Sequence, residues 1–268
     1  MHAIHRHQLE NRSLAYSWSH EPHPRPLIIL HGLGDSAIHT YAPRFSSTSL
    51  QSTPALFIDL PGFGEGSADA TYASSIEAMA DDVAHLIEHL GVQGAPIFAH
   101  SMGANIAISL TAMHPTVTQV MILAEPLLRP EESVLAAGIA KQSESAFVAR
   151  GYEMLVRATS LQAHRDDKAA EAFLLSLRLA NPIAMHRAAT SLLRDQDPSF
   201  ESRLLQIPTP VTLLTGALSN MTFSGAVRER LRIHRVPHSG HFMIAEAASE
   251  TSYAILNLIN GVHYGGIE

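Results

Sequence analysis

The sequence predicts an α/β protein with an open, mostly parallel sheet, helices on both faces and an inserted helical cap. Two observations support this prediction. Six short apolar runs show no polar alternation, which is typical of strands buried on both faces, and segments with helical periodicity separate them. One long stretch, 127–206, contains no convincing strand. The alternation favours a doubly wound sheet, and the interruption favours a separate helical unit.

The strands are expected in two groups. Polar alternation over 2–18 predicts a two-stranded hairpin at one edge of the sheet. The apolar runs predict six buried strands, at 27–30, 55–60, 96–99, 120–124, 211–215 and 232–236. Several of these runs end at glycine, proline or histidine, which marks the loops that follow them.

Helices are expected between these strands and after the last one. Apolar residues recur at helical spacing over 76–90, and Gly91 follows as a stop signal. Two further helices of the core are predicted at 102–114 and at 247–260, where Gly261 ends the pattern.

The break in the rhythm divides the chain. We assign residues 1–126 and 207–268 to an α/β core and residues 127–206 to a helical cap. The cap is expected to hold several helices rich in Ala, Leu and Arg. Turns between them are predicted near Gly138, Gly151, Asp166 and Pro182.

The composition excludes several classes of protein. The chain has 268 residues, with 18 Lys and Arg against 25 Asp and Glu, and a formal net charge of −7. This balance argues against a nucleic-acid partner, because a phosphate-binding surface needs an excess of basic residues. The absence of cysteine excludes disulfides, thiolate metal sites and a cysteine nucleophile. No apolar stretch approaches the ~18 residues of a membrane span, and the first residues lack a secretory signal, so we expect a cytoplasmic protein without a membrane partner.

The strongest chemical signal is Ala99-His100-Ser101-Met102-Gly103, between a predicted strand and a predicted helix. It is a relative of G-x-S-x-G, with Ala in place of the first Gly, in which small residues allow a sharp turn that exposes the serine. We interpret Ser101 as a nucleophile and the Met102 N–H, at the helix N-terminus, as a donor to an oxyanion. The alternative is a serine that only caps the helix.

Two more loops lie at the same end of the predicted parallel strands, where ligands bind in such sheets. One begins at His31 and Gly32 after a buried strand, and its Leu33 N–H is the candidate second oxyanion donor. The other follows the last strand and contains His238 and His241. We favour His241 as the general base because it lies nearer the final helix. An ordinary glycine-rich turn and a locally bonded histidine are the alternatives.

With these loops the sequence resembles the α/β-hydrolase family in its capped form. The matching segments are 31–34 (HGLG), 59–67 (DLPGFGEGS), 100–103 (HSMG) and 240–242 (GHF). The resemblance covers 1–126 and 207–262, whereas the cap matches only in position. It implies the α/β-hydrolase fold and a triad in the order serine, acid, histidine, but it says much less about the substrate.

The acid that this resemblance implies is missing from its usual place. Family members often carry Asp after the strand that here reads VTLLTG, at a position that falls on Ser219 or Asn220, but residues 202–228 contain no Asp or Glu. Glu125 ends the preceding strand, beside the expected nucleophile turn. This resembles some branches of the family, the haloalkane dehalogenases among them, which take their acid from that strand. We therefore predict that Glu125 orients His241. A purely structural Glu125, or Asn220 as a neutral orienter, are the alternatives.

The predicted function is that of a cofactor-independent serine hydrolase, which forms an acyl-enzyme on a small or medium ester. A helical cap usually encloses an apolar pocket, although the sequence identifies no substrate-binding residue. Thioester hydrolysis, acyl transfer and carbon–carbon bond hydrolysis of ring-cleavage products need the same groups. Dehalogenase and epoxide hydrolase chemistry is disfavoured, because Ser101 stands where those relatives have Asp. A ligand-binding, receptor-like relative with weak turnover is the alternative from another class, motivated by the missing acid.

The expected partner is a small-molecule substrate, and no metal is expected. His85-Leu86-Ile87-Glu88-His89 matches the H-x-x-E-H zinc signature. Leu86 and Ile87, however, belong to the apolar face of a predicted helix, and no third ligand is apparent. We interpret this segment as a solvated helix face. The sequence leaves open whether the protein is a monomer or a homo-oligomer.

Overall fold

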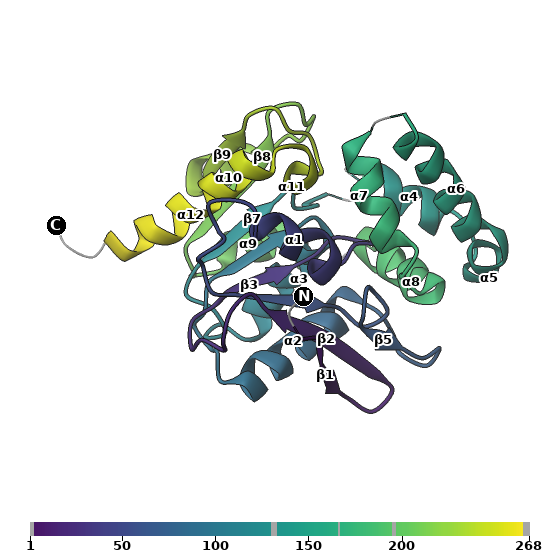
Figure 1. Ribbon diagram of the computed structural model, residues 1–268, viewed down its shortest axis with the longest axis horizontal. Coiled ribbons are helices and arrows are strands. Elements are labelled where there is room, and N and C mark those ends of the chain that lie inside the picture. The colour runs from purple at the N-terminus through teal and green to yellow at the C-terminus, as the bar shows by residue number, and fades with distance from the viewer. Residues whose placement is uncertain (1–2, 130–132, 166, 195–196, 265–268) are drawn as a thin grey trace.

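A computed structural model describes residues 3–129, 133–165, 167–194 and 197–264 (Figure 1). Its centre is a nine-stranded sheet in the order β1-β2-β4-β3-β6-β7-β8-β9, with β5 paired to β2. The antiparallel edge holds β1 (His5–Gln8), β2 (Arg12–Trp18) and β5 (Ser67–Ala68). The parallel part holds β3 (Leu27–Leu30), β4 (Ala55–Asp59), β6 (Ile97–His100), β7 (Met121–Ala124), β8 (Val211–Gly216) and β9 (Arg232–Val236). The predicted open, mostly parallel sheet is confirmed.

Burial on both faces explains why the parallel strands read as continuous apolar runs. In β3, Ile28 and Leu30 join one hydrophobic core, whereas Leu27 and Ile29 join the other. Successive strand residues point to opposite faces, so a strand covered on both sides needs apolar side chains at every position.

The helices of the α/β core cover these two faces. The first face packs against α2 (Ile76–Leu90), α3 (Met102–Met113), α9 (Phe200–Gln206) and α10 (Gly225–Arg230). The second packs against η1 (Ala37–Tyr41), α1 (Ala42–Phe45), α11 (Met243–Glu246) and α12 (Ala248–Tyr264). The prediction that the last helix stops at Gly261 was wrong, because α12 continues through this glycine to Tyr264.

A group of helices lies to one side of the sheet, as Figure 1 shows. It comprises α4 (Val134–Ala140), α5 (Glu144–Ala146), η3 (Phe147–Gly151), α6 (Tyr152–Ala163), α7 (Lys168–Leu177) and α8 (Pro182–Leu193). Contacts such as that between Thr40 Oγ1 and Ser176 Oγ, 2.8 Å apart, join this group to the core. By contrast, α9 lies on the core helices, where Arg203 donates to Ser109 Oγ at 3.0 Å. The domain boundaries stay predictions.

Of the turns predicted within 127–206, the one near Gly151 is absent, and the one near Gly138 comes a few residues later, after α4 ends at Ala140. Gly138 lies inside α4, and Gly151 ends η3 directly before α6 begins. Pro182 opens α8 as its first residue, while Asp166 lies outside the described residues. Within the described part of the chain, none of the helices combines the length and apolarity needed to cross a membrane.

Candidate active site

Ser101 stands at the turn between β6 and α3. Its backbone is strained, with φ of 53° and ψ of −121°, and its N–H donates to Ala124 O at 2.8 Å. The turn is tight because α3 packs directly on the end of β3. A Cβ atom at Gly103 would lie 2.6 Å from His31 O, so only glycine fits there. The small residue of the sequence pattern is therefore required by packing.

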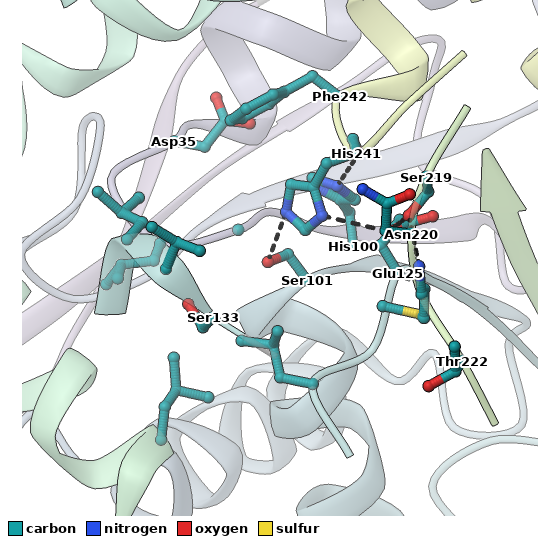
Figure 2. Close-up of a pocket in the computed structure, with 17 residues that line it drawn as sticks. Asp35, His100, Ser101, Glu125, Ser133, Ser219, Asn220, Thr222, His241 and Phe242 are labelled. Atoms are coloured by element: carbon teal, nitrogen blue, oxygen red, sulfur yellow. Dashed lines mark hydrogen bonds and ion pairs between the residues drawn. The ribbon is translucent and has the colours of Figure 1, made fainter. Parts of the chain in front are cut away.

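Two side chains from neighbouring loops complete a chain of contacts that begins at Ser101 (Figure 2). His241, after β9, holds its Nε2 3.1 Å from Ser101 Oγ and its Nδ1 3.3 Å from Glu125 Oε2. Glu125 directly follows β7 and has a φ of 52°. The structure thus brings together the three residues predicted as nucleophile, base and acid. His238, the other histidine of the loop, is exposed.

The Glu125 carboxylate is buried and well supplied with donors. Thr215 Oγ1 and the Gly216 N–H donate to Oε1 at 2.9 and 2.8 Å, and Ser219 Oγ donates to Oε2 at 2.8 Å. Burial alone raises the pKa of Glu125, but hydrogen bonds from His241, Gly216 and Ser219 outweigh it and hold this pKa below its ordinary value. Glu125 is therefore ionised opposite His241, which is the state that the predicted orienting role requires.

The loop after β8 carries no acid, and its residues take other places. Ser219 supports Glu125. Asn220 lines the cavity next to it, and among the described residues no hydrogen bond joins Asn220 to His241. The contact at His241 Nδ1 thus belongs to Glu125, and the geometry gives no support to Asn220 as the orienter.

The two predicted oxyanion donors, the N–H groups of Leu33 and Met102, come from two different segments of the chain. Leu33 follows the end of β3, and Met102 opens α3. Within the described residues, neither N–H donates to another protein group. His31 fixes the first loop, because its Nδ1–H donates to the Gly32 carbonyl at 2.8 Å and its Nε2 accepts from the Leu60 N–H at 3.1 Å. Their role as an oxyanion hole stays a prediction.

A cavity of about 560 Å³ opens over Ser101. Most of its wall is apolar and comes from Leu33, Leu127, Val134, Leu135, Leu192, Met221 and Phe242. Its remaining polar groups belong to Asp35, Ser133, Ser219, Asn220 and Thr222. No Lys or Arg belongs to the described lining. Sequence reasoning named none of these as substrate-binding residues. The strand-end loops contain several of them, but nothing in the sequence points to Val134 or Leu192 in the helical insert.

The zinc-like segment lies away from this cavity. His85 and His89 are exposed on α2, and the His89 ring packs against that of His7, with ring centroids 4.7 Å apart. Among the described residues, no three acidic or histidine side chains converge as a metal site would require.

Comparisons with known proteins agree with this fold. The sequence profile described as the alpha/beta hydrolase family matches residues 27–252, so the chain belongs to that family and is a hydrolase of it. A relative from Caulobacter sp. (strain K31), named "Putative carbamate hydrolase RutD", is 25% identical over 261 residues, which are 90% of this chain and 95% of the relative.

Solved structures share the fold at lower identity. A thermophilic esterase from Thermogutta terrifontis superposes with a TM-score of 0.78 at 19% identity, over 97% of this chain and 99% of the esterase. The N-acyl homoserine lactonase AidH, complexed with N-butanoyl homoserine, gives a TM-score of 0.75 at 18% identity, over 99% of this chain and 98% of the lactonase. The predicted α/β-hydrolase fold is confirmed.

Proposed function

We propose that this hydrolase cleaves small or medium esters through an acyl-enzyme on Ser101. The observation that carries the proposal is the contact chain from Ser101 Oγ to His241 and on to Glu125. A serine on a strained strand-to-helix turn, a histidine within reach of its hydroxyl and a buried carboxylate behind the histidine form the arrangement that activates a serine.

In the proposed reaction, Ser101 Oγ attacks the ester carbonyl carbon while His241 Nε2 takes the hydroxyl proton. Glu125 holds the Nδ1–H and stabilises the imidazolium. The carbonyl oxygen becomes an oxyanion, which the Leu33 and Met102 N–H groups bind. The intermediate expels the alcohol, which receives the proton from His241. Water, deprotonated by His241, then releases the acid and restores Ser101.

The cavity favours an uncharged substrate. Its volume falls within the range of small-molecule sites, and its described lining combines an apolar wall with the acidic Asp35 and no Lys or Arg. A carboxylate group on the substrate would lose its hydration there without gaining a cation. Ring-cleavage products carry such a carboxylate, so this lining favours an ester over the carbon–carbon bond hydrolysis that the sequence also allows. The esterase among the structural neighbours supports this choice.

The first test is the intact mass after treatment with a fluorophosphonate. We expect one covalent adduct on the wild type and none on Ser101→Ala, because a fluorophosphonate labels an activated serine and not an ordinary one. Turnover of 4-nitrophenyl acetate should disappear in the same variant. A folded wild type without an adduct, or an adduct that persists in Ser101→Ala, would refute the proposal. The first of these results would favour the receptor-like alternative.

The second test compares a neutral ester with a carboxylated ester of the same length. We expect kcat/KM for the carboxylated ester to be at least about tenfold lower, because its charge is desolvated without a partner. Val134→Lys places a cation at the cavity, on a residue that is 88% exposed, and should narrow this difference. Val134→Gln is the matched neutral control. Equal kcat/KM values for the two esters in the wild type would argue against the uncharged substrate class.

A further inference from the structure

A second histidine lies directly behind the candidate base. His100, the residue before Ser101, is buried, and its ring centroid is 4.9 Å from that of His241. Its Nε2 is 2.8 Å from the backbone oxygen of His241, and its Nδ1 is 2.9 Å from the hydroxyl of Tyr41 in η1. Figure 2 shows the His100 ring next to that of His241, with a dashed line that joins it to the His241 backbone. The proposed reaction uses neither His100 nor Tyr41.

The contact with the His241 carbonyl fixes which nitrogen of the His100 ring carries a hydrogen. A carbonyl oxygen only accepts, so Nε2 must carry a hydrogen and donate it to His241 O. In the neutral ring Nδ1 is then an acceptor, and the fully buried Tyr41 hydroxyl donates to it. The other tautomer would set a lone pair of Nε2 against the carbonyl oxygen. Burial, followed by the neighbouring His241 ring, lowers the pKa of His100 to about 3, which also favours the neutral ring.

The His241 backbone needs such an anchor. Residues 237–242 form an irregular loop, and the His241 side chain is 38% exposed, so its own packing does little to fix the ring. Both ring nitrogens must nevertheless face their partners at the same time. Errors of about 1 Å in such positions cost on the order of 100-fold in rate. A hydrogen bond to the carbonyl of His241 itself restrains the backbone from which the ring projects.

We propose that His100 and Tyr41 are positioning residues for the base: the Tyr41 hydroxyl holds His100 as the Nε2–H tautomer, and His100 anchors the His241 carbonyl. This inference rests on the proposed function.

The neutral state of the His100 ring also matters for the proton transfer, because His241 becomes positively charged when it takes the Ser101 proton. A charged His100 at 4.9 Å would oppose that step. Besides His241 and the Tyr41 hydroxyl, the titratable groups that act on the His100 ring include Glu125 and His31, and Asp35 acts on Tyr41 itself.

Steady-state kinetics on 4-nitrophenyl acetate test the anchor. His100→Leu removes the donor, and we expect kcat to fall roughly 10- to 100-fold with little change in KM, because the base is misplaced while the cavity persists. His100→Gln, whose amide can donate to the same carbonyl, should restore most of this loss. Tyr41→Phe should lower kcat by a smaller factor. Tyr152→Phe is the matched control, since it removes a tyrosine hydroxyl that bonds Leu177 O away from the site, and should behave as the wild type.

Nitrogen NMR of the histidine rings supplies a readout that does not depend on turnover. The ring signals that vanish in His100→Gln belong to His100, and they should show a protonated Nε2 and an unprotonated Nδ1. The opposite tautomer, or wild-type kcat in folded Tyr41→Phe and His100→Leu, would overturn the inference. If His100→Leu does not fold, the comparison of Tyr41→Phe with Tyr152→Phe decides. An inactive wild type with the expected tautomer would instead refute the proposed function and leave the anchor in place.

Discussion

At the scale of single residues, Glu125 is the proposed replacement for an acid that family members often carry in a different loop. The carboxylate reaches His241 from the end of β7, while Ser219, close to the usual acid position, donates to it. Both loops lie at the carboxyl ends of neighbouring parallel strands, β7 and β8. An acid on either strand can therefore approach the same histidine, and the sequence position of the acid is less constrained than its place in space.

Replacing Glu125 by glutamine tests this role. The amide nitrogen can donate to His241 Nδ1, which leaves the proton on Nε2 and removes the base from Ser101. We expect kcat to fall on the order of 10³- to 10⁴-fold, as for comparable replacements of a triad acid. Circular dichroism should remain that of the wild type. Glu153→Gln, in an exposed i,i+4 pair with Arg157, is the matched control. Less than a tenfold loss in folded Glu125→Gln would show that Glu125 is structural.

The residue scale also shows where sequence reasoning ends. The sequence can name Ser101, His241 and the oxyanion candidates because each stands at a fixed offset from a predicted strand end, and their roles stay predictions. Glu125 is predicted because residues 202–228 contain no acid and because Glu125 ends the strand beside the serine turn. The contacts of Tyr41 and Thr215 could not be predicted, because they join side chains that are distant in the chain and have no motif of their own.

At the scale of secondary structure elements, two helical glycines differ in whether a side chain would fit at their positions. Gly103 lies where α3 meets β3, and a Cβ there would clash with the carbonyl oxygens of His31 and Leu30 at 2.6 and 2.7 Å. Gly138 lies inside α4, where a Cβ would meet nothing within 4 Å. The two positions therefore offer a matched pair of substitutions.

We expect Gly103→Ala to destabilise the fold by at least about 2 kcal/mol, because backbone atoms cannot give way as a flexible side chain does. Gly138→Ala should stabilise it by about 0.5–1 kcal/mol, since alanine is the better helix former at an unobstructed position. Urea unfolding of both variants measures the free energies of unfolding. A neutral Gly103→Ala would mean that α3 and β3 can separate without cost.

Elements of the sheet were predicted better than those of the insert for a physical reason. A strand covered on both faces must be apolar throughout, so its boundaries are visible in the sequence. A helix that packs on one face tolerates glycine, and Gly151 is small because Gln142 and Phe147 pack against it, not because the chain turns there. Glycine therefore marked a turn correctly at Gly91, where φ is 67°, and wrongly at Gly151.

At the scale of the whole molecule, the site makes folding stability depend on pH. The pKa of His100 is lowered by burial to about 3, from 6.5 in the unfolded chain. Between these values the unfolded chain binds a proton that the folded chain does not, so the free energy of unfolding falls as pH drops below 6.5. The lowered pKa of Glu125 acts in the same direction: its contribution is present above its unfolded value of 4.5 and is lost as pH falls through the folded value.

The His100 contribution can be isolated by comparing the melting temperatures of the wild type and His100→Gln at about pH 7 and pH 5. At pH 5 the wild type should have lost about 2 kcal/mol through His100, which corresponds to roughly 4–8 °C in a chain of this size. His100→Gln has no such group and should lose correspondingly less over the same interval. Ionisable groups other than His100 are common to both proteins, so their contributions cancel in the comparison. Equal losses in the two proteins would mean that the His100 ring takes up its proton without unfolding, and the neutral ring would then not be a condition of the fold.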